Sequence, residues 1–243
     1  MIRPAANVSI LYPDVPVLER AEQARRDGFT AIESWWPFAT AGPSDGEVDA
    51  FVASVADAGV ELIAMNLFGG DLEAGERGIT SDTRRGAEFD DSLAVGLEVG
   101  GRLGTRMFNM LVGIGPVGDL AAVRLSTAAR AAVAEGRTIL VEPLSGIEDY
   151  PITTAQDAFT LVDAIGGPNA GAGVLGDLYH LAVNGEDVGM LIATRGQDLA
   201  HVQIADSPGR GAPGTGSLPL DEWVATLEQV GYEGWVALEH LPG

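Results

Sequence analysis

The chain has 243 residues, and its 14 basic and 35 acidic side chains give a formal net charge of −21 at pH 7. This charge repels nucleic acid and anionic membranes and no basic run offsets it, so neither is expected as a partner. The sequence contains no cysteine, which excludes thiol nucleophiles, disulfides and thiolate metal sites, and no lysine, which excludes Schiff-base and pyridoxal phosphate chemistry.

Helix-like and strand-like segments alternate along the chain without a composition shift or a long linker, so we expect one domain over residues 1–243. Strands are predicted at residues 7–12, 30–33, 60–65, 105–110, 137–142, 173–177, 199–205 and 234–239. Helices are predicted at residues 16–28, 46–58, 81–103, 119–135, 153–165, 187–194 and 219–230. This order predicts a parallel (β/α)8 TIM barrel of the α/β class, with the final helix missing or very short.

Without that helix, the first and last strands would expose apolar surface, so we expect a homo-oligomer that covers the seam. There is no apolar run of about 18 residues and no signal-peptide pattern, which predicts a cytoplasmic protein.

Four apolar runs end in a side chain that carries oxygen, at Glu142, Asp177, Gln203 and Glu239. The gaps between them can each hold a strand, a helix and the return, so the four side chains would meet where barrel enzymes place their active sites. Three carboxylates in one pocket repel each other unless a cation lies among them. Hard oxygen donors favour Mg²⁺ or Mn²⁺, while a nearby histidine would allow Co²⁺ or Zn²⁺.

Aromatic and histidine side chains lie near these strand ends. Trp36 follows the second predicted strand and is a candidate substrate contact, although tandem tryptophans also serve packing. His180 either caps the next helix or contacts the substrate. His201 shares a strand face with Gln203, and we expect it to support Gln203 rather than to bind metal.

Two arginines lie in glycine-containing loops, Arg77 and Arg210. A keto acid needs a cationic partner for its carboxylate, and these two are the best placed to provide one. Arg77 belongs to the long excursion at residues 66–80, a length typical of functional lids. Arg210 is interpreted as a surface side chain.

Several short segments together carry a family resemblance. They are Ala74-Gly-Glu-Arg-Gly-Ile79, Leu111-Val-Gly113, Glu142-Pro143, Asp177-Leu-Tyr-His180, His201-Val-Gln-Ile-Ala-Asp206, Pro213-Gly-Thr-Gly216 and Gly231-Tyr-Glu-Gly-Trp235. With them, the chain resembles the hydroxypyruvate isomerase family of the xylose isomerase-like barrel superfamily from Asn7 to Glu239.

The resemblance implies that Glu142, Asp177, Gln203 and Glu239 bind one divalent metal ion, and that Glu142 and Glu239 transfer protons on opposite faces of the substrate. The chemistry agrees, because a metal held by a carbonyl and an adjacent hydroxyl acidifies the intervening C–H and stabilises an enediolate. The expected reaction converts hydroxypyruvate to tartronate semialdehyde.

Three positions depart from the family pattern, with Met65 in place of histidine, Ser145 in place of asparagine and His240-Leu241 in place of a tyrosine-lysine pair. The substrate is therefore left open. A ketose 3-epimerase, a keto-inositol dehydratase and a sugar-binding barrel without catalysis are alternatives, and the charge disfavours an abasic-site endonuclease.

Overall fold

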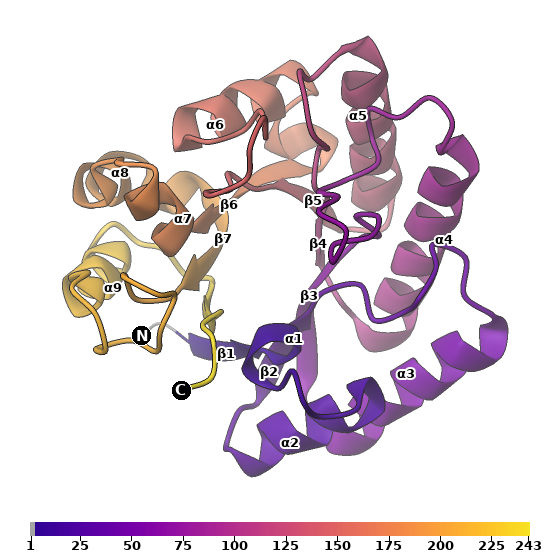
Figure 1. Cartoon of the computed structure of the whole chain (residues 1–243), viewed down its shortest axis with the longest axis horizontal. Coiled ribbons are helices and arrows are strands. Elements are labelled where there is room, and N and C mark those ends of the chain that lie inside the picture. The colour runs from indigo at the N-terminus through magenta and orange to yellow at the C-terminus, as the bar shows by residue number, and fades with distance from the viewer. Residues whose placement is uncertain (1–2) are drawn as a thin grey trace.

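Eight parallel strands close into a barrel in chain order, with helices around the outside (Figure 1). This computed structural model describes residues 3–243. The strands are β1 (Arg3–Asn7), β2 (Ala31–Ser34), β3 (Glu61–Asn66), β4 (Met107–Asn109), β5 (Thr138–Val141), β6 (Ala172–Asp177), β7 (Leu199–Ile204) and β8 (Trp235–Leu238). The predicted TIM barrel is confirmed.

The long helices follow the predicted ones, and short helical turns join them. The α-helices are α1 (Val8–Leu11), α2 (Arg20–Arg26), α3 (Asp45–Ala58), α4 (Gly86–Leu103), α5 (Asp119–Ala134), α6 (Ala155–Ala164), α7 (Leu178–Val183), α8 (Val188–Arg195) and α9 (Leu220–Gln229), and the 3₁₀ turns are η1 (Val17–Glu19), η2 (Pro168–Ala170) and η3 (Gly196–Asp198). None of the described helices is both long and apolar enough to cross a lipid bilayer.

The first predicted strand, residues 7–12, is wrong over most of its length. The strand ends at Asn7, whose side-chain oxygen accepts a hydrogen bond from Ser9 N at 3.1 Å and caps α1. The apolar run after Asn7 therefore forms a helical turn in which Val8 and Ile10 are buried. As a consequence, Asn7 lies at the carboxyl end of β1 rather than at its start.

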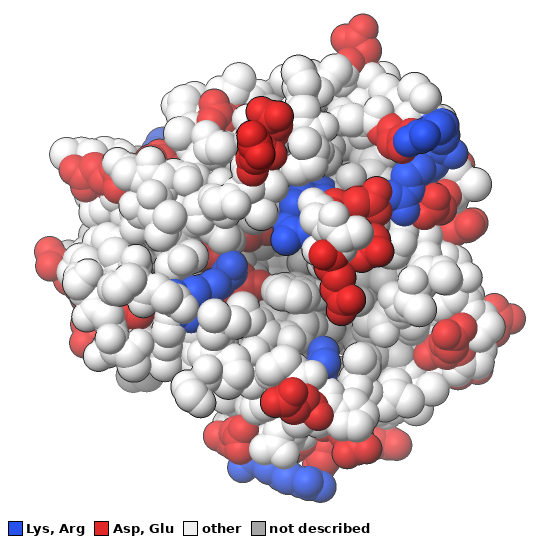
Figure 2. Space-filling view, in the orientation of Figure 1, with Lys and Arg blue, Asp and Glu red and all other residues white. Residues whose placement is uncertain are grey.

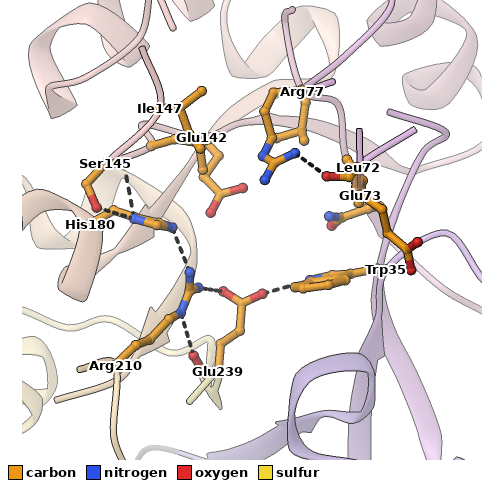
Figure 3. Close-up of a pocket in the computed structure, with 13 residues that line it drawn as sticks. Trp35, Leu72, Glu73, Arg77, Glu142, Ser145, Ile147, His180, Arg210 and Glu239 are labelled. Atoms are coloured by element: carbon orange, nitrogen blue, oxygen red, sulfur yellow. Dashed lines mark hydrogen bonds and ion pairs between the residues drawn. The ribbon is translucent and has the colours of Figure 1, made fainter. Parts of the chain in front are cut away.

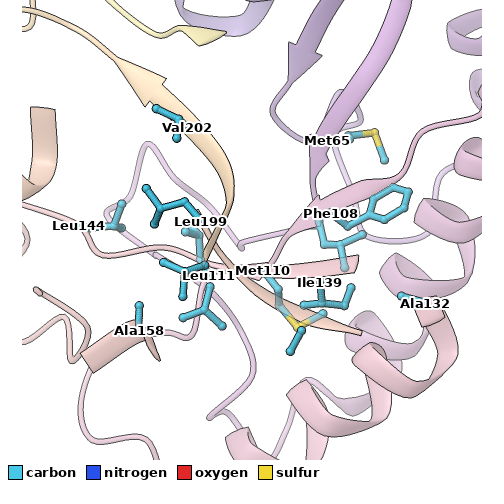
Figure 4. Close-up of a cluster of buried hydrophobic side chains, with 14 of the residues drawn as sticks. Met65, Phe108, Met110, Leu111, Ala132, Ile139, Leu144, Ala158, Leu199 and Val202 are labelled. Carbon is cyan, nitrogen blue, oxygen red and sulfur yellow. The ribbon is translucent and has the colours of Figure 1, made fainter. Parts of the chain in front are cut away.

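The core lies between the strands and the surrounding helices (Figure 4). Phe108 of β4 and Ile139 of β5 are completely buried there. Two glycines of α4 allow this close packing, because a Cβ at Gly96 would lie 2.4 Å from Leu67 and one at Gly100 would lie 2.7 Å from Phe108.

No helix follows β8 in residues 239–243, as predicted. The C-terminus and β1 lie on the side of the barrel between α9 and α2 (Figure 1). At the start of β1 and β8, Arg3 stacks on Trp235, with its guanidinium carbon 4.2 Å from the ring centre.

Candidate active site

Every strand carries a polar or charged side chain at its carboxyl end or within one residue of it. In chain order these are Asn7, Glu33, Asn66, Asn109, Glu142, Asp177, Gln203 and Glu239. The strand register places Asn7 beside Glu33 and Asp177 beside Gln203. All except Asn66 are buried. The four predicted residues thus form half of a complete polar ring at one end of the barrel.

A cavity of about 310 Å³ opens at this end of the barrel. Figure 2 shows a hollow near the middle of this face, with acidic and basic side chains at its edge. In Figure 3 the carboxylates of Glu142 and Glu239 point toward a common space, between the guanidinium groups of Arg77 and Arg210. Apolar side chains form much of the remaining wall, namely Trp35, Leu72, Leu111, Leu144 and Ile147.

Glu142, Asp177 and His180 form one compact cluster. Each offers a ligand atom, and the three atoms lie within 4.8 Å of one another. Asp177 also caps α7, because one of its oxygens accepts from Tyr179 N at 2.9 Å. The His180 ring lies between Ser145 and Arg210, with Nδ1 2.7 Å from Ser145 Oγ and Nε2 3.1 Å from Arg210 Nη1. His180 is therefore directed into the site rather than acting as the helix cap, and the cluster could bind a metal ion.

Glu239 is held by three donors. Its Oε1 accepts from Asn7 Nδ2 at 2.8 Å and from Trp35 Nε1 at 2.9 Å, and its Oε2 lies 2.6 Å from Arg210 Nη2. In Figure 3 Arg210 and Trp35 hold the Glu239 carboxylate from either side.

The interpretation of Arg210 as a surface side chain is wrong. Its side chain is 19% exposed, and Nη2 bridges Asp177 at 3.0 Å and Glu239 at 2.6 Å. Arg210 has a left-handed backbone with φ of 53°, an uncommon conformation for an arginine. A glycine-rich loop therefore turns this guanidinium inward, where it pairs with two carboxylates.

Asp206 organises that loop. Its two carboxylate oxygens accept hydrogen bonds from the backbone N–H groups of Ser207, Gly214, Gly216 and Leu218 at 2.8 to 3.0 Å. A Cβ at Gly216 would lie 2.3 Å from Ser207 O, so only glycine fits there. The Asp and Gly positions of the sequence motif therefore set the path of the segment that carries Arg210.

Burial controls the proton affinity of the two glutamates. It raises the pKa of Glu142 to about 8, with repulsion from Asp177 as the next cause, while the hydrogen bond from Asn109 opposes the shift. Burial also raises the pKa of Glu239 well above its usual range, although Arg210 acts in the opposite direction. The Glu142 carboxyl group thus holds its proton near neutral pH until another cation enters the site.

The remaining donor atoms fit a divalent cation. Gln203 Oε1 and Asn109 Oδ1 are buried and have no hydrogen-bond partner within residues 3–243. An unsatisfied buried oxygen costs about 1–3 kcal/mol, and a cation would remove that cost. An all-oxygen set beside a histidine suits hard divalent metals.

Arg77 enters the cavity from the long excursion after β3. Its Nη1 donates to the carbonyl oxygens of Leu72 at 2.9 Å and Glu76 at 2.6 Å, which fixes the guanidinium. Its own carbonyl accepts from Gly113 N at 2.8 Å. A Cβ on Gly78 would lie 2.1 Å from Leu111 O, so the glycine after Arg77 permits this close contact. Arg77 has no carboxylate partner among the described residues.

The predicted helix start at residue 81 is wrong, because α4 begins at Gly86. Arg124 of α5 holds the intervening chain, with Nη1 donating to the carbonyl oxygens of Ile79, Thr80 and Asp82 at 2.8 to 3.1 Å. The bond to Asp82 occupies a carbonyl that the longer helix would have used, and the bonds to Ile79 and Thr80 anchor the excursion that carries Arg77.

The tryptophan pair divides between two cavities. Trp35 lines the pocket of Glu239, whereas Trp36 packs edge-on against Phe38 and Phe68 and lines a neighbouring cavity. The structure thus does not bring Trp36 into the pocket that Glu142 and Glu239 line.

The three positions that depart from the family pattern lie in different parts of the structure. Ser145 contacts His180 in the pocket, Met65 is buried in the core, and His240 lies outside the residues that line the pocket. Of the three, Ser145 is the one that touches the site.

Sequence reasoning missed Asn7, Glu33, Trp35 and Asn109. A signal was present, because Glu33 ends a predicted strand and Asn109 lies in the last part of another. Asn7 was missed because the predicted first strand, residues 7–12, placed it at the start of a strand rather than at the end. His201 was predicted as support for Gln203; in the structure its Nε2 lies 2.6 Å from Glu33 Oε2.

Comparisons with known proteins agree with this geometry. A family model described as xylose isomerase-like TIM barrel matches residues 21–242. A putative hydroxypyruvate isomerase of Streptomyces coelicolor is 41% identical, with 98% of this chain and 90% of the relative covered. The hydroxypyruvate isomerase of Escherichia coli K12 and the 2-oxo-tetronate isomerase of Cupriavidus necator are each 31% identical, with 100% of this chain and 94% of each relative covered.

Among solved structures, a crystal structure described as AP endonuclease, family 2, from Brucella melitensis has a TM-score of 0.88 and is 32% identical, with 100% of this chain and 94% of that chain covered. The relatives from Escherichia coli and Cupriavidus necator match the whole chain, and the family model matches β2 to β8. The chain therefore belongs to the xylose isomerase-like TIM barrel family and, within it, to the hydroxypyruvate isomerase family of isomerases.

Proposed function

We propose that this isomerase interconverts hydroxypyruvate and tartronate semialdehyde with one divalent metal ion, Mg²⁺ or Mn²⁺. Glu142, Asp177, Gln203 and Glu239 would hold the ion, with His180 beside it. When bound, the ion supplies a Lewis acid that makes the C–H next to the keto group acidic. The relatives named hydroxypyruvate isomerase and 2-oxo-tetronate isomerase support a small hydroxy-keto acid as the substrate.

The observation that carries the proposal is the guanidinium of Arg77. It faces the cavity opposite Arg210, and no described carboxylate pairs with it (Figure 3). Arg210 already pairs with Asp177 and Glu239. The carboxylate of a keto acid would supply the anionic partner that Arg77 lacks among the described residues. A neutral ketose would leave Arg77 without an anion.

Glu142 and Glu239 are proposed to transfer the proton. One carboxylate removes a C3 proton from hydroxypyruvate to give an enediolate, and the other delivers a proton to C2. The C3 hydroxyl loses its proton as the C2 oxygen gains one, so substrate and product have the same atoms. Trp35 and the apolar wall keep water away from the enediolate.

Arg77→Met tests the proposed substrate class. We expect it to raise KM for hydroxypyruvate by about 10- to 100-fold with a smaller effect on kcat, since a hydrogen bond to a charged group contributes about 1.5–3 kcal/mol. Initial rates with Mn²⁺ should be compared between hydroxypyruvate and dihydroxyacetone, which has no carboxylate. The wild type should strongly prefer the acid, and the variant should lose most of that preference.

Arg84→Met is the matched control, because Arg84 lies between that excursion and α4 but is 85% exposed and pairs with Asp82. It should behave as wild type. A wild-type enzyme that epimerises ketoses or prefers dihydroxyacetone would contradict the proposed substrate, as would an Arg77 variant with an unchanged preference.

A further inference from the structure

Glu33 is a buried carboxylate that does not line the cavity. It is 2% exposed, lies at the end of β2 and belongs to the polar ring. Oε1 accepts from Gln203 Nε2 at 2.5 Å and from Asn7 Nδ2 at 2.9 Å, and Oε2 lies 2.6 Å from His201 Nε2. Glu33 is thus hydrogen-bonded to β7, which carries the candidate ligand Gln203, and to β1, whose Asn7 also donates to Glu239.

These contacts determine which end of the Gln203 amide faces Glu33. An ionised carboxylate can only accept hydrogen bonds, whereas an amide has a donating nitrogen and an accepting oxygen of nearly the same shape. The nitrogen must therefore face Glu33. The oxygen is left on the other branch of the side chain, buried and without a partner among residues 3–243.

The orientation of the Gln203 amide matters because Gln203 lies beside the acidic cluster. Gln203 is the register neighbour of Asp177, one of the three residues of the compact acidic cluster. A divalent cation at that cluster is attracted by an amide oxygen and repelled by the partly positive amide NH₂ group. An amide free to adopt either orientation would present the wrong group part of the time.

We infer that Glu33 is a positioning residue that turns the Gln203 amide so that its oxygen, and not its nitrogen, is presented to the metal ion. This inference rests on the proposed metal site. Asn7 extends the same arrangement, because its Nδ2 donates both to Glu33 and to Glu239. One carboxylate outside the cavity thereby orients a ligand and is connected to a proposed proton-transfer residue.

Two substitutions separate orientation from charge. Glu33→Gln removes the charge but keeps an oxygen at the same reach, which can accept from Gln203. Its NH₂ group would face His201 Nε2, which can accept once the proton of the neutral ring is on Nδ1. Glu33→Asp keeps the charge but withdraws the acceptor by one methylene. We expect Glu33→Asp to weaken Mn²⁺ binding by about tenfold or more, the scale for ligand-supporting partners, and Glu33→Gln to stay close to wild type.

Electron paramagnetic resonance of free Mn²⁺ measures these affinities. Glu61→Gln is the control, because Glu61 is an exposed acid at the amino-terminal end of β3, away from the polar ring. The opposite order, in which Glu33→Gln binds Mn²⁺ weakly and Glu33→Asp binds it as tightly as wild type, would show that only the charge matters and would overturn the inference. Equal affinities in all three proteins would overturn it as well. A wild type that binds no Mn²⁺ would instead contradict the proposed metal site.

The metal-free protein provides a second readout. With ¹⁵N-labelled glutamine, the Gln203 NH₂ signal should show one strongly hydrogen-bonded, slowly exchanging proton, which persists in Glu33→Gln and is lost in Glu33→Asp. Because this signal needs no metal and no turnover, it tests the contact even if the proposed reaction fails. An ordinary, rapidly exchanging NH₂ signal in the wild type would contradict the inferred role of Glu33.

Discussion

Replacement of Glu239 by glutamine is expected to lower kcat by about 10²-fold or more, the usual scale for a lost general acid or base. The structure adds a second reason. All three partners of Glu239, which are Asn7, Trp35 and Arg210, donate hydrogen bonds. A glutamine has one accepting oxygen, so its NH₂ group would face a donor in either orientation. Mn²⁺ affinity should fall less than turnover, because an oxygen can still reach the ion.

Steady-state rates and Mn²⁺ titrations check this expectation, with Glu61→Gln as the control for removal of one negative charge outside the pocket. The control should keep wild-type kcat. A Glu239 variant that retains more than a tenth of the wild-type kcat would exclude Glu239 as a proton-transfer residue.

Removal of divalent metal is expected to abolish isomerisation and to lower the melting temperature, with a greater loss at pH 8 than at pH 5. The pKa of Glu142 in the folded chain is raised from its ordinary 4.5 to about 8, so the folded metal-free chain binds more protons than the unfolded chain in this range. The contribution of Glu142 to the stability of the metal-free chain is therefore fully present below pH 4.5 and is lost as the pH rises through about 8.

Metal binding requires ionised carboxylates, so the stabilisation by Mn²⁺ should grow over the same range. At about 100 times its Kd an ion adds about 2.7 kcal/mol, or about 5–10 °C for a chain of this size. Calorimetry at pH 5, 6.5 and 8, with and without Mn²⁺, measures both trends. Thr154→Ala, which breaks the capping box of α6 away from the site, is the control. It should lower the melting temperature by the same amount with and without Mn²⁺. A metal-free melting temperature that rises with pH would contradict the burial of Glu142.

The barrel was predictable because strand and helix periodicities are local. Residues 138–141 and 199–204 are apolar runs bounded by turn residues, and each is followed by a helical pattern. The position of β1 was not predictable, because the apolar run from Val8 to Leu11 can be buried either as a strand or as a helix. The cap by Asn7 decides the outcome, and it is a side-chain contact that hydrophobic pattern does not encode.

The site was half predictable for a related reason. Glu142, Asp177, Gln203 and Glu239 follow conspicuous apolar runs, so their placement follows from strand order alone. The role of Glu33 depends on partners 168 and 170 residues away in the chain. Arg210 depends on a left-handed backbone that Asp206 enforces through a loop, and a glycine-rich sequence does not show on which side such a loop places an arginine.

The central claim is that two carboxylates move a proton between neighbouring carbons of a hydroxy-keto acid. Isomerisation of hydroxypyruvate in deuterated water with Mg²⁺, with the aldehyde trapped as its hydrazone and analysed by mass spectrometry, tests it most directly. Because one glutamate takes the C3 proton and another supplies the C2 proton, tartronate semialdehyde should carry solvent deuterium at C2. A product that retains the original C3 hydrogen at C2 would indicate direct hydride transfer and would contradict the account.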